Sequence, residues 1–192
     1  MKNKLQKSSG NIDIEIFNDD LQRLYQCGCY KTIIPKTYNT FTELILINTS
    51  GGITSGDKLN AKFEFSNSKI CISTQAAEKI YSGFGLPAKI SIELNLKNES
   101  FVFWLPKELI LFNNCNLERR INVNLLNNSN LFMSETVVFG RKSMNEKITN
   151  GYFSDFWNVF EGKKLAHAEA ISFNGNIDKL FSNKITFNKN CS

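Results

Sequence analysis

Residues 46–59, LINTSGGITSGDKL, have the glycine spacing of a phosphate-binding loop. Four residues separate Gly51 from Gly56, as in that motif, which then requires a lysine to hold the phosphates. Asp57 stands at the lysine position, where its carboxylate would repel phosphate. The residues that follow, KLNAKFEF, alternate like a strand where the motif needs a helix. We therefore interpret the segment as a turn in which Gly51, Gly52 and Gly56 supply positive φ angles.

The cysteines and the single histidine form no zinc or nucleophile motif. Cys27 and Cys29 are separated by one residue, not two, and no second pair follows. His167 is the only histidine, so any Ser-His-Asp or Cys-His arrangement would depend on it, and no G-x-S-x-G sequence is present. Whether Cys27, Cys29 or His167 contacts a metal stays open at this point.

Carboxylates occupy apolar positions of several predicted strands. In LFMSETVVF, residues 131–139, Glu135 falls on the same face of the predicted strand as every second apolar residue. Glu169 does the same in LAHAEAISF, residues 165–173. Glu43 does the same in an earlier strand. Burying a charge is unfavourable unless it is paired, hydrated or bound to a metal. These positions fit either a buried glutamate with a structural partner or an internal polar site, and both interpretations stay open.

The composition predicts one domain, residues 1–192, with a substantial core. Apolar residues make up 42% of the chain, and 23 basic against 18 acidic residues give a net charge of +5. The basic residues are scattered, whereas a nucleic-acid surface needs a basic face. An odd number of cysteines, no apolar N-terminal segment and no apolar run of about 18 residues predict a cytoplasmic protein outside the membrane.

Period-two alternation dominates the chain, as in IDIEIF and KISIELNL. Further strands are expected near residues 41–48, 60–65, 69–74, 100–105, 117–125, 130–139, 153–160 and 164–173. Helical patterns are few and short, at residues 18–25, 141–148 and 176–182. No repeat shows convincing self-similarity, and we attribute the frequent asparagines to coding bias. We predict a mostly β fold of stacked sheets with a few short helices, and favour an open two-layer arrangement over a closed barrel.

Four segments, in this order and spacing, resemble the urease accessory protein D family (UreD or UreH): LINTSGGITSGDKL, STQAAEKIY, WLPKELILFNNCNLERRINVNL and SETVVFGRKSMNE. GCYKTIIPK and DFWNVFEGKKLAHAEAISFNG also fit, and the resemblance covers nearly all of residues 25–175. Ser55 departs from the family, which usually has glycine there. Family members also continue well past the segment that matches residue 175, and the portion absent here contributes to partner binding and to closing the sheets.

The resemblance implies a non-catalytic scaffold that helps to insert nickel into apo-urease. Family members bind an all-helical F-type accessory protein, which recruits a G-type GTPase, and the complex docks on urease. Nickel is thought to pass through an internal channel with acidic walls, without a tightly bound cofactor. Asp57, Glu135 and Glu169 match family positions that carry acids, and Glu78 lies in the matching TQAAEK segment. We hypothesise that Asp57, Glu78, Glu135 and Glu169 line this path, because carboxylates and water relay such cations.

Two functions unrelated to urease are kept as alternatives. One is a β-sandwich that binds a small polar ligand among the inward acids, which predicts a stable monomer with a defined pocket. The other is a hydrolase that uses Glu135 and Glu169 as acid and base, which predicts two carboxylates in one cleft with pKa values pushed apart. The scaffold instead predicts partner-dependent solubility without turnover, and the ordered motifs favour it.

Overall fold

Strands make up most of the structure, a computed structural model that describes residues 7–37, 39–140 and 148–177. No helix occurs in these ranges, so the predicted short helices are wrong wherever the structure can test them. The strands are β1 (Ser9–Phe17), β2 (Asp20–Gly28), β3 (Tyr30–Ile33), β4 (Thr42–Asn48), β5 (Lys58–Ser66), β6 (Lys69–Gln75), β7 (Glu78–Ile80), β8 (Ala88–Lys97), β9 (Phe101–Trp104), β10 (Leu109–Leu111), β11 (Cys115–Leu125), β12 (Asn130–Met133), β13 (Val137–Phe139), β14 (Asn150–Glu161) and β15 (Lys164–Asn176).

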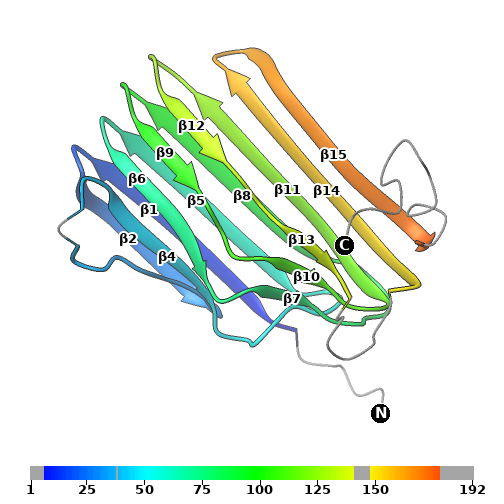
Figure 1. The fold of residues 1–192 in the computed structure, drawn as a ribbon. Helices are drawn as coiled ribbons and strands as arrows, with labels where there is room; N and C mark the ends of the chain where they lie inside the picture. The colour runs from blue at the N-terminus through cyan, green and yellow to red at the C-terminus, as the bar shows by residue number, and fades with distance from the viewer. Residues whose placement is uncertain (1–6, 38, 141–147, 178–192) are drawn as a thin grey trace.

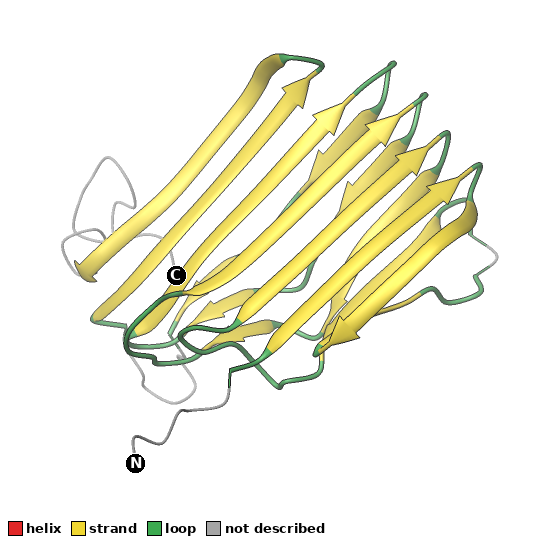
Figure 2. Ribbon diagram, turned by 180° about the vertical axis from the view of Figure 1, so that it is seen from behind, coloured by secondary structure: helices red, strands yellow, loops and turns green. Residues whose placement is uncertain are grey.

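The strands form three sheets in two layers. Sheet A has the order β15-β14-β11-β8-β5-β1-β2, sheet B the order β12-β9-β6-β4-β3, and sheet C the order β13-β10-β7. Sheets B and C lie in front of sheet A in Figure 1, and the view from behind in Figure 2 shows sheet A running across the whole molecule. The predicted stacked-sheet fold is therefore confirmed.

The chain winds through sheets A, B and C in turn, as in a solenoid. Three successive coils, β5-β6-β7, β8-β9-β10 and β11-β12-β13, are followed by β14 in sheet A. Each strand of a coil pairs in parallel with its counterpart in the next coil. The sequence was expected to lack an internal repeat, but the backbone repeats. Neighbouring coils need only the same alternation of inward and outward residues, so the side chains themselves can differ.

The core is built from rows of inward side chains that stack from coil to coil. Ile14, Phe63, Leu94 and Val123 are neighbours in register across β1, β5, β8 and β11, and each is 0% exposed. Trp104 of sheet B packs edge-on against Phe63, with ring centroids 6.5 Å apart. The alternation predicted from IDIEIF and KISIELNL therefore places the apolar residues inside, where their burial stabilises the fold.

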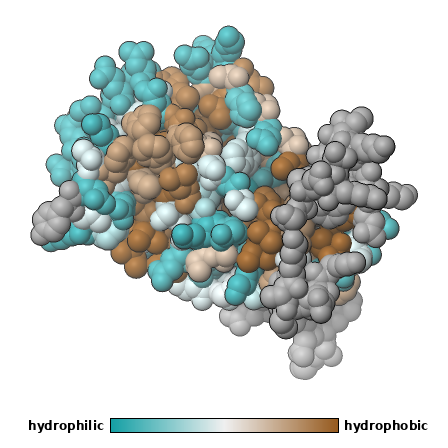
Figure 3. All heavy atoms as spheres, in the orientation of Figure 1, coloured by the Kyte–Doolittle hydropathy of each residue, from teal (hydrophilic) through white to brown (hydrophobic). Residues whose placement is uncertain are grey.

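Aromatic rings also gather on the outward face of sheet B. The ring centroid of Phe103 lies 4.9 Å from that of Phe101, 5.0 Å from Phe41 and 5.8 Å from Phe132. In Figure 3, apolar residues cover part of the face where sheet B lies in Figure 1. These contacts join β9 and β12 on the side opposite the core.

Asparagines occupy the turns that follow four strands of sheet A, namely β1, β5, β8 and β11. Asn18, Asn67, Asn98 and Asn127 all have φ angles near +50°, in the left-handed region that asparagine tolerates better than most residues. The Asn67 side-chain amide donates to Asn18 Oδ1 at 2.7 Å, and that of Asn127 donates to Asn98 Oδ1 at 2.9 Å. Some of the asparagines attributed to coding bias thus have a structural role in stacking the coils.

Several predicted elements differ from those observed. The helix predicted at 18–25 is a turn followed by β2, an exposed edge strand whose apolar residues happen to fall at helical spacing. The strand predicted at 130–139 divides into β12 and β13, because the chain turns from sheet B to sheet C. The short strands β3, β7 and β10 were missed.

The helices predicted at 141–148 and 176–182 lie mostly outside the described residues. In the described ranges, no helix has the length and apolar character needed to cross a membrane.

We predict that Asn67→Ala lowers the free energy of unfolding by about 2 kcal/mol, because alanine loses the side-chain hydrogen bond and is strained at positive φ. Asn67→Gly is the matched control, since it loses the hydrogen bond but accepts the backbone conformation, and we expect it to cost about half as much. Urea unfolding of the three proteins measures the difference. Equal losses in both variants would show that the left-handed backbone is not the constraint at this turn.

Candidate functional site

One arginine and two acids are buried together in the interior. Arg119 of β11 donates from Nε to Asp155 Oδ1 at 2.9 Å and from Nη2 to Asp155 Oδ2 at 2.6 Å. The same Nη2 lies 2.6 Å from Oε2 of Glu135, in the turn between β12 and β13. The side chains of Arg119, Glu135 and Asp155 are only 7%, 4% and 4% exposed. An ion pair so deeply buried must be well coordinated, because each charge has lost its hydration.

Two tryptophans complete the contacts of the buried acids. Trp104 of β9 donates from Nε1 to Glu135 Oε1 at 2.6 Å, and Trp157 of β14 donates from Nε1 to Asp155 Oδ2 at 3.2 Å. Glu135 Oε2 makes a charge-assisted contact with Arg119 Nη2 at 2.6 Å, and no other described residue donates to it. Because a carboxylate oxygen has two lone pairs, Glu135 Oε2 can accept one further contact from a ligand.

The solenoid brings these residues together from three elements. Arg119 and Asp155 are direct neighbours in the parallel pairing of β11 with β14. Arg119 shares the inward parity of the buried residues Leu117 and Ile121, so its side chain enters the core. Glu135 follows the end of β12, where the chain turns from sheet B to sheet C above sheet A. The stacking of coils thus sets the distances within the cluster.

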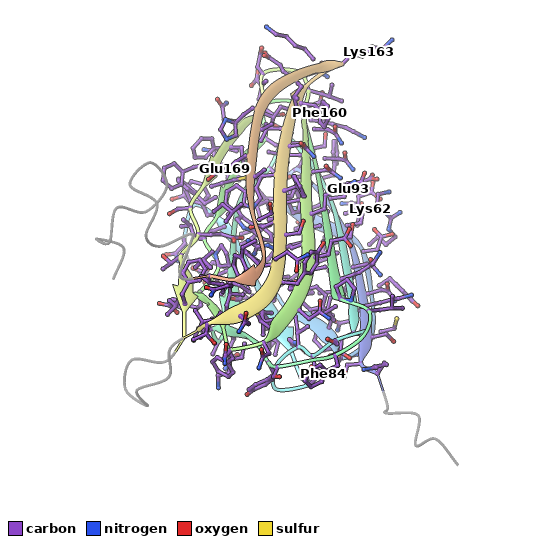
Figure 4. The ribbon with its side chains drawn as sticks, turned by 90° about the vertical axis from the view of Figure 1, so that its right-hand side faces the viewer. Lys62, Phe84, Glu93, Phe160, Lys163 and Glu169 are labelled. Carbon is purple, nitrogen blue, oxygen red and sulfur yellow. The ribbon has the colours of Figure 1, made fainter. Side chains whose placement is uncertain are left out.

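A cavity of about 260 Å³ opens onto the two acids. Its walls include Glu135 and Asp155, together with Trp157, Glu169 and Ile171. Glu169 of β15 is the cross-strand neighbour of Trp157, and its side chain is half exposed. Figure 4 shows Glu169 on one side of sheet A, with Glu93 and Lys62 on the other. The cavity therefore joins the buried cluster to a carboxylate nearer the solvent.

The charge of Arg119 is secured by its surroundings. Burial lowers its pKa, but the hydrogen bond to Asp155 and the charges of Glu135 and Asp155 outweigh that effect and raise the pKa above its ordinary value. Arg119 stays protonated across the physiological pH range. The guanidinium is thus a permanent positive charge in the core.

Glu78 of β7 lies at a second cavity, of about 220 Å³, whose walls include Tyr30, Asn48 and Gly52. Burial raises the pKa of Glu78 to about 7, against the hydrogen bond from Asn48 and the backbone amide of Lys79. The Asn48 amide donates to Glu78 Oε1 at 3.1 Å. Glu78 therefore changes its charge near neutral pH.

Tyr30 of β3 is within electrostatic range of both cavities. Its side chain is buried, which raises its pKa, and the charges of Glu78 and Glu135 raise it further while Arg119 lowers it. Tyr30 lines the cavity of Glu78, and its hydroxyl also experiences the charges of Arg119 and Glu135.

Asp57 lines neither of these two cavities. Its Oδ1 accepts from the Ser8 backbone amide at 2.8 Å, and its Oδ2 accepts from the Thr54 amide at 2.9 Å, so both oxygens hold the loop closed. Gly51, Gly52 and Gly56 have φ angles of 79°, 144° and 83°. The serine that departs from the family, Ser55, is absent from the residues with positive φ, so it fits this backbone.

The structure brings some of the predicted site residues together and separates others. Glu135 and Glu169 share a cavity, Glu78 lies at the second, and Asp57 belongs to the loop. Glu43 has the parity opposite to that of the buried Leu44 and Leu46, so it faces outward. No three His, Cys, Asp or Glu side chains among the described residues are arranged to hold a metal ion. The proposed nickel path stays a prediction.

Sequence reasoning missed Arg119, Asp155, Trp104, Trp157 and Tyr30. Two of them carry the signal that selected Glu135, a charged residue on the apolar face of an alternating strand. Arg119 alternates with buried apolar residues in LERRINV, and Asp155 does so in FSDFW. Their pairing depends on the register of β11 with β14, which a single sequence does not reveal.

The residues that sequence reasoning left open lie away from the cluster. His167 is mostly exposed, with Nε2 3.9 Å from Glu169 Oε2. Cys27, on the edge strand β2, accepts a long hydrogen bond from Asn11 of β1, at 3.5 Å. Neither cysteine of the pair lines the two acidic cavities.

Glu78 should make stability depend on pH. Because its folded pKa of about 7 exceeds the ordinary 4.5, protonation favours the folded state. This stabilising contribution, roughly 3 kcal/mol, is present below pH 4.5 and is lost as pH rises to about 7. We expect Glu78→Gln to be more stable than the wild type above neutral pH and similar at low pH, as measured by urea unfolding. The outward-facing Glu93→Gln is the control, and a pH-independent difference for Glu78→Gln would contradict the prediction.

Comparison with known proteins identifies the family. The family model described as UreD urease accessory protein matches residues 11–191. A urease accessory protein UreD of Chelativorans sp. (strain BNC1) is 39% identical over 150 residues, 78% of this chain and 54% of the relative. One from Sinorhizobium medicae (strain WSM419) is 37% identical over 162 residues, 84% of this chain and 58% of the relative.

A third relative, the UreD of Rhodopseudomonas palustris (strain ATCC BAA-98 / CGA009), is 32% identical over 166 residues, 86% of this chain and 60% of the relative. The chain therefore spans little more than half the length of the curated relatives it matches. The family match still extends over nearly the whole chain. The chain belongs to the UreD urease accessory protein family.

Proposed function

We propose that this chain takes part in urease maturation as a non-catalytic scaffold that passes nickel to apo-urease. The partners in this proposal are an F-type accessory protein, a G-type GTPase and the urease apoprotein, and the nickel ion is cargo. Membership of the UreD family supports the role in maturation. The observation that carries the step with nickel is the cavity that joins the buried Glu135 and Asp155 to Glu169.

The interior suits an ion that moves on. Carboxylates and water are acceptable ligands for a borderline divalent cation, and they bind it less tightly than clustered histidines or thiolates. Glu135 Oε2 can accept one further contact, and the half-exposed Glu169 extends the acidic lining of the cavity towards the solvent. A passing ion would meet these carboxylates one or two at a time, with water completing its coordination.

Hydrolytic use of the same acids is disfavoured by their contacts. A hydrolase of this kind needs one carboxyl group free to donate a proton and another free to accept one. Glu135 is held by Trp104 and Arg119, and its side chain is only 4% exposed. A small ion that enters the cavity can still contact an oxygen of Glu135. A substrate would have to reach both Glu135 and Glu169, and the burial of Glu135 prevents this.

The proposal is tested by co-expressing the chain with the F-type and G-type proteins and apo-urease. We expect Glu135→Gln combined with Glu169→Gln to lower the nickel content of purified urease by roughly tenfold, since the acidic wall of the cavity is lost. Glu118→Gln is the matched control, because Glu118 lies on β11 beside Arg119 but pairs with the exposed Lys89 at 3.6 Å. Co-purification of the partners must be equal in all strains. Unchanged nickel content in the double variant would refute the proposal.

A further inference from the structure

Arg119 contacts the acidic pair from the core side. It touches both Glu135 and Asp155 at 2.6 Å, yet it does not contribute to the cavity wall that these two residues form. The guanidinium therefore lies behind the carboxylates, and a cation in the cavity would meet them from the other side. Arg119 can influence such a cation through charge without coordinating it.

The charges around the cavity nearly balance those of a divalent cation. Glu135, Asp155 and Glu169 bring three negative charges when ionised, and Arg119 brings one permanent positive charge. The remaining two negative charges match one divalent ion. Without Arg119, the net charge of these groups would rise to three negative charges, and the Coulomb attraction for an ion in the cavity would be stronger even if the ion touched only one or two carboxylates at a time.

We propose that Arg119 is a positioning residue that weakens the hold of the Glu135–Asp155–Glu169 cavity on a divalent cation, so that the ion is released instead of stored. This inference rests on the proposed function, because it assigns the residue that controls release at the same site. The bidentate contact fixes Asp155, and the close approach to Glu135 offsets its charge while Oε2 keeps its capacity for a ligand.

The test compares two variants that differ only at Arg119, and Glu135 keeps its hydrogen bond from Trp104 in both. Asp155→Asn is compared with Arg119→Gln/Asp155→Asn, in which two neutral amides replace the ion pair, an exchange that buried pairs often tolerate. The full chain is titrated with Ni²⁺ at neutral pH, and release to a chelator is followed in time. We expect Asp155→Asn to bind more weakly than the wild type, and added Arg119→Gln to lower the Kd about tenfold and slow release to the same extent.

If Arg119 had only a structural role, its substitution would not increase the affinity for Ni²⁺. The double variant would then bind Ni²⁺ as weakly as Asp155→Asn, and this outcome would overturn the inference. Arg119→Lys keeps the positive charge, so its Kd should stay within about threefold of the wild type. A Kd about tenfold lower in the lysine variant would also overturn it, because charge would not be the cause.

The two proposals fail in different ways. If Glu135→Gln/Glu169→Gln leaves urease nickel unchanged while the Arg119 variants shift Ni²⁺ affinity as expected, the proposed function fails and the control of affinity by Arg119 is supported. If that double variant lowers urease nickel but the Arg119 substitution shifts neither affinity nor release, the proposed function stands and the release role is wrong.

Discussion

The ion pair between Arg119 and Asp155 is the constraint on which the interior depends. A guanidinium in the core is tolerable only when its donors are satisfied and its charge is offset. Asp155 meets both needs with two hydrogen bonds, and Glu135 adds a second negative charge. The pair connects β11 to β14 and places the turn after β12 above them. The same contacts that make a buried charge acceptable also hold two carboxylates at the wall of a cavity.

Solenoid winding explains how a chain without sequence repeats can build such an interior. Parallel stacking brings residues from successive coils side by side, so that apolar rows such as Ile14, Phe63 and Leu94 fill most of the space. Polar residues replace apolar ones where Tyr30, Arg119 and the acids gather. Because sheet A continues through β14 and β15 beyond the last strands of sheets B and C, the cavity has Glu169 on its outer wall.

Much of the fold could be predicted from alternation alone, because burial on one face leaves a period of two in strands such as β1 and β8. The short strands β7 and β10 could not, since three residues carry too little pattern. Glu135 and Glu169 were found by their parity, and they share a cavity. Asp57 has the same acidic character but closes a loop through backbone amides, a difference set by local geometry. The partner of Arg119 required the register between two strands 36 residues apart.

The proposed role in nickel transfer requires that the interior cavity accept a divalent cation beside the buried acids. Anomalous X-ray diffraction at the nickel edge, from crystals of the full chain soaked in Ni²⁺, tests it most directly. We expect an anomalous peak in the cavity lined by Glu135, Asp155 and Glu169, and its loss in Glu135→Gln/Glu169→Gln. Peaks confined to surface groups such as His167, with an empty cavity at full nickel occupancy elsewhere, would contradict it.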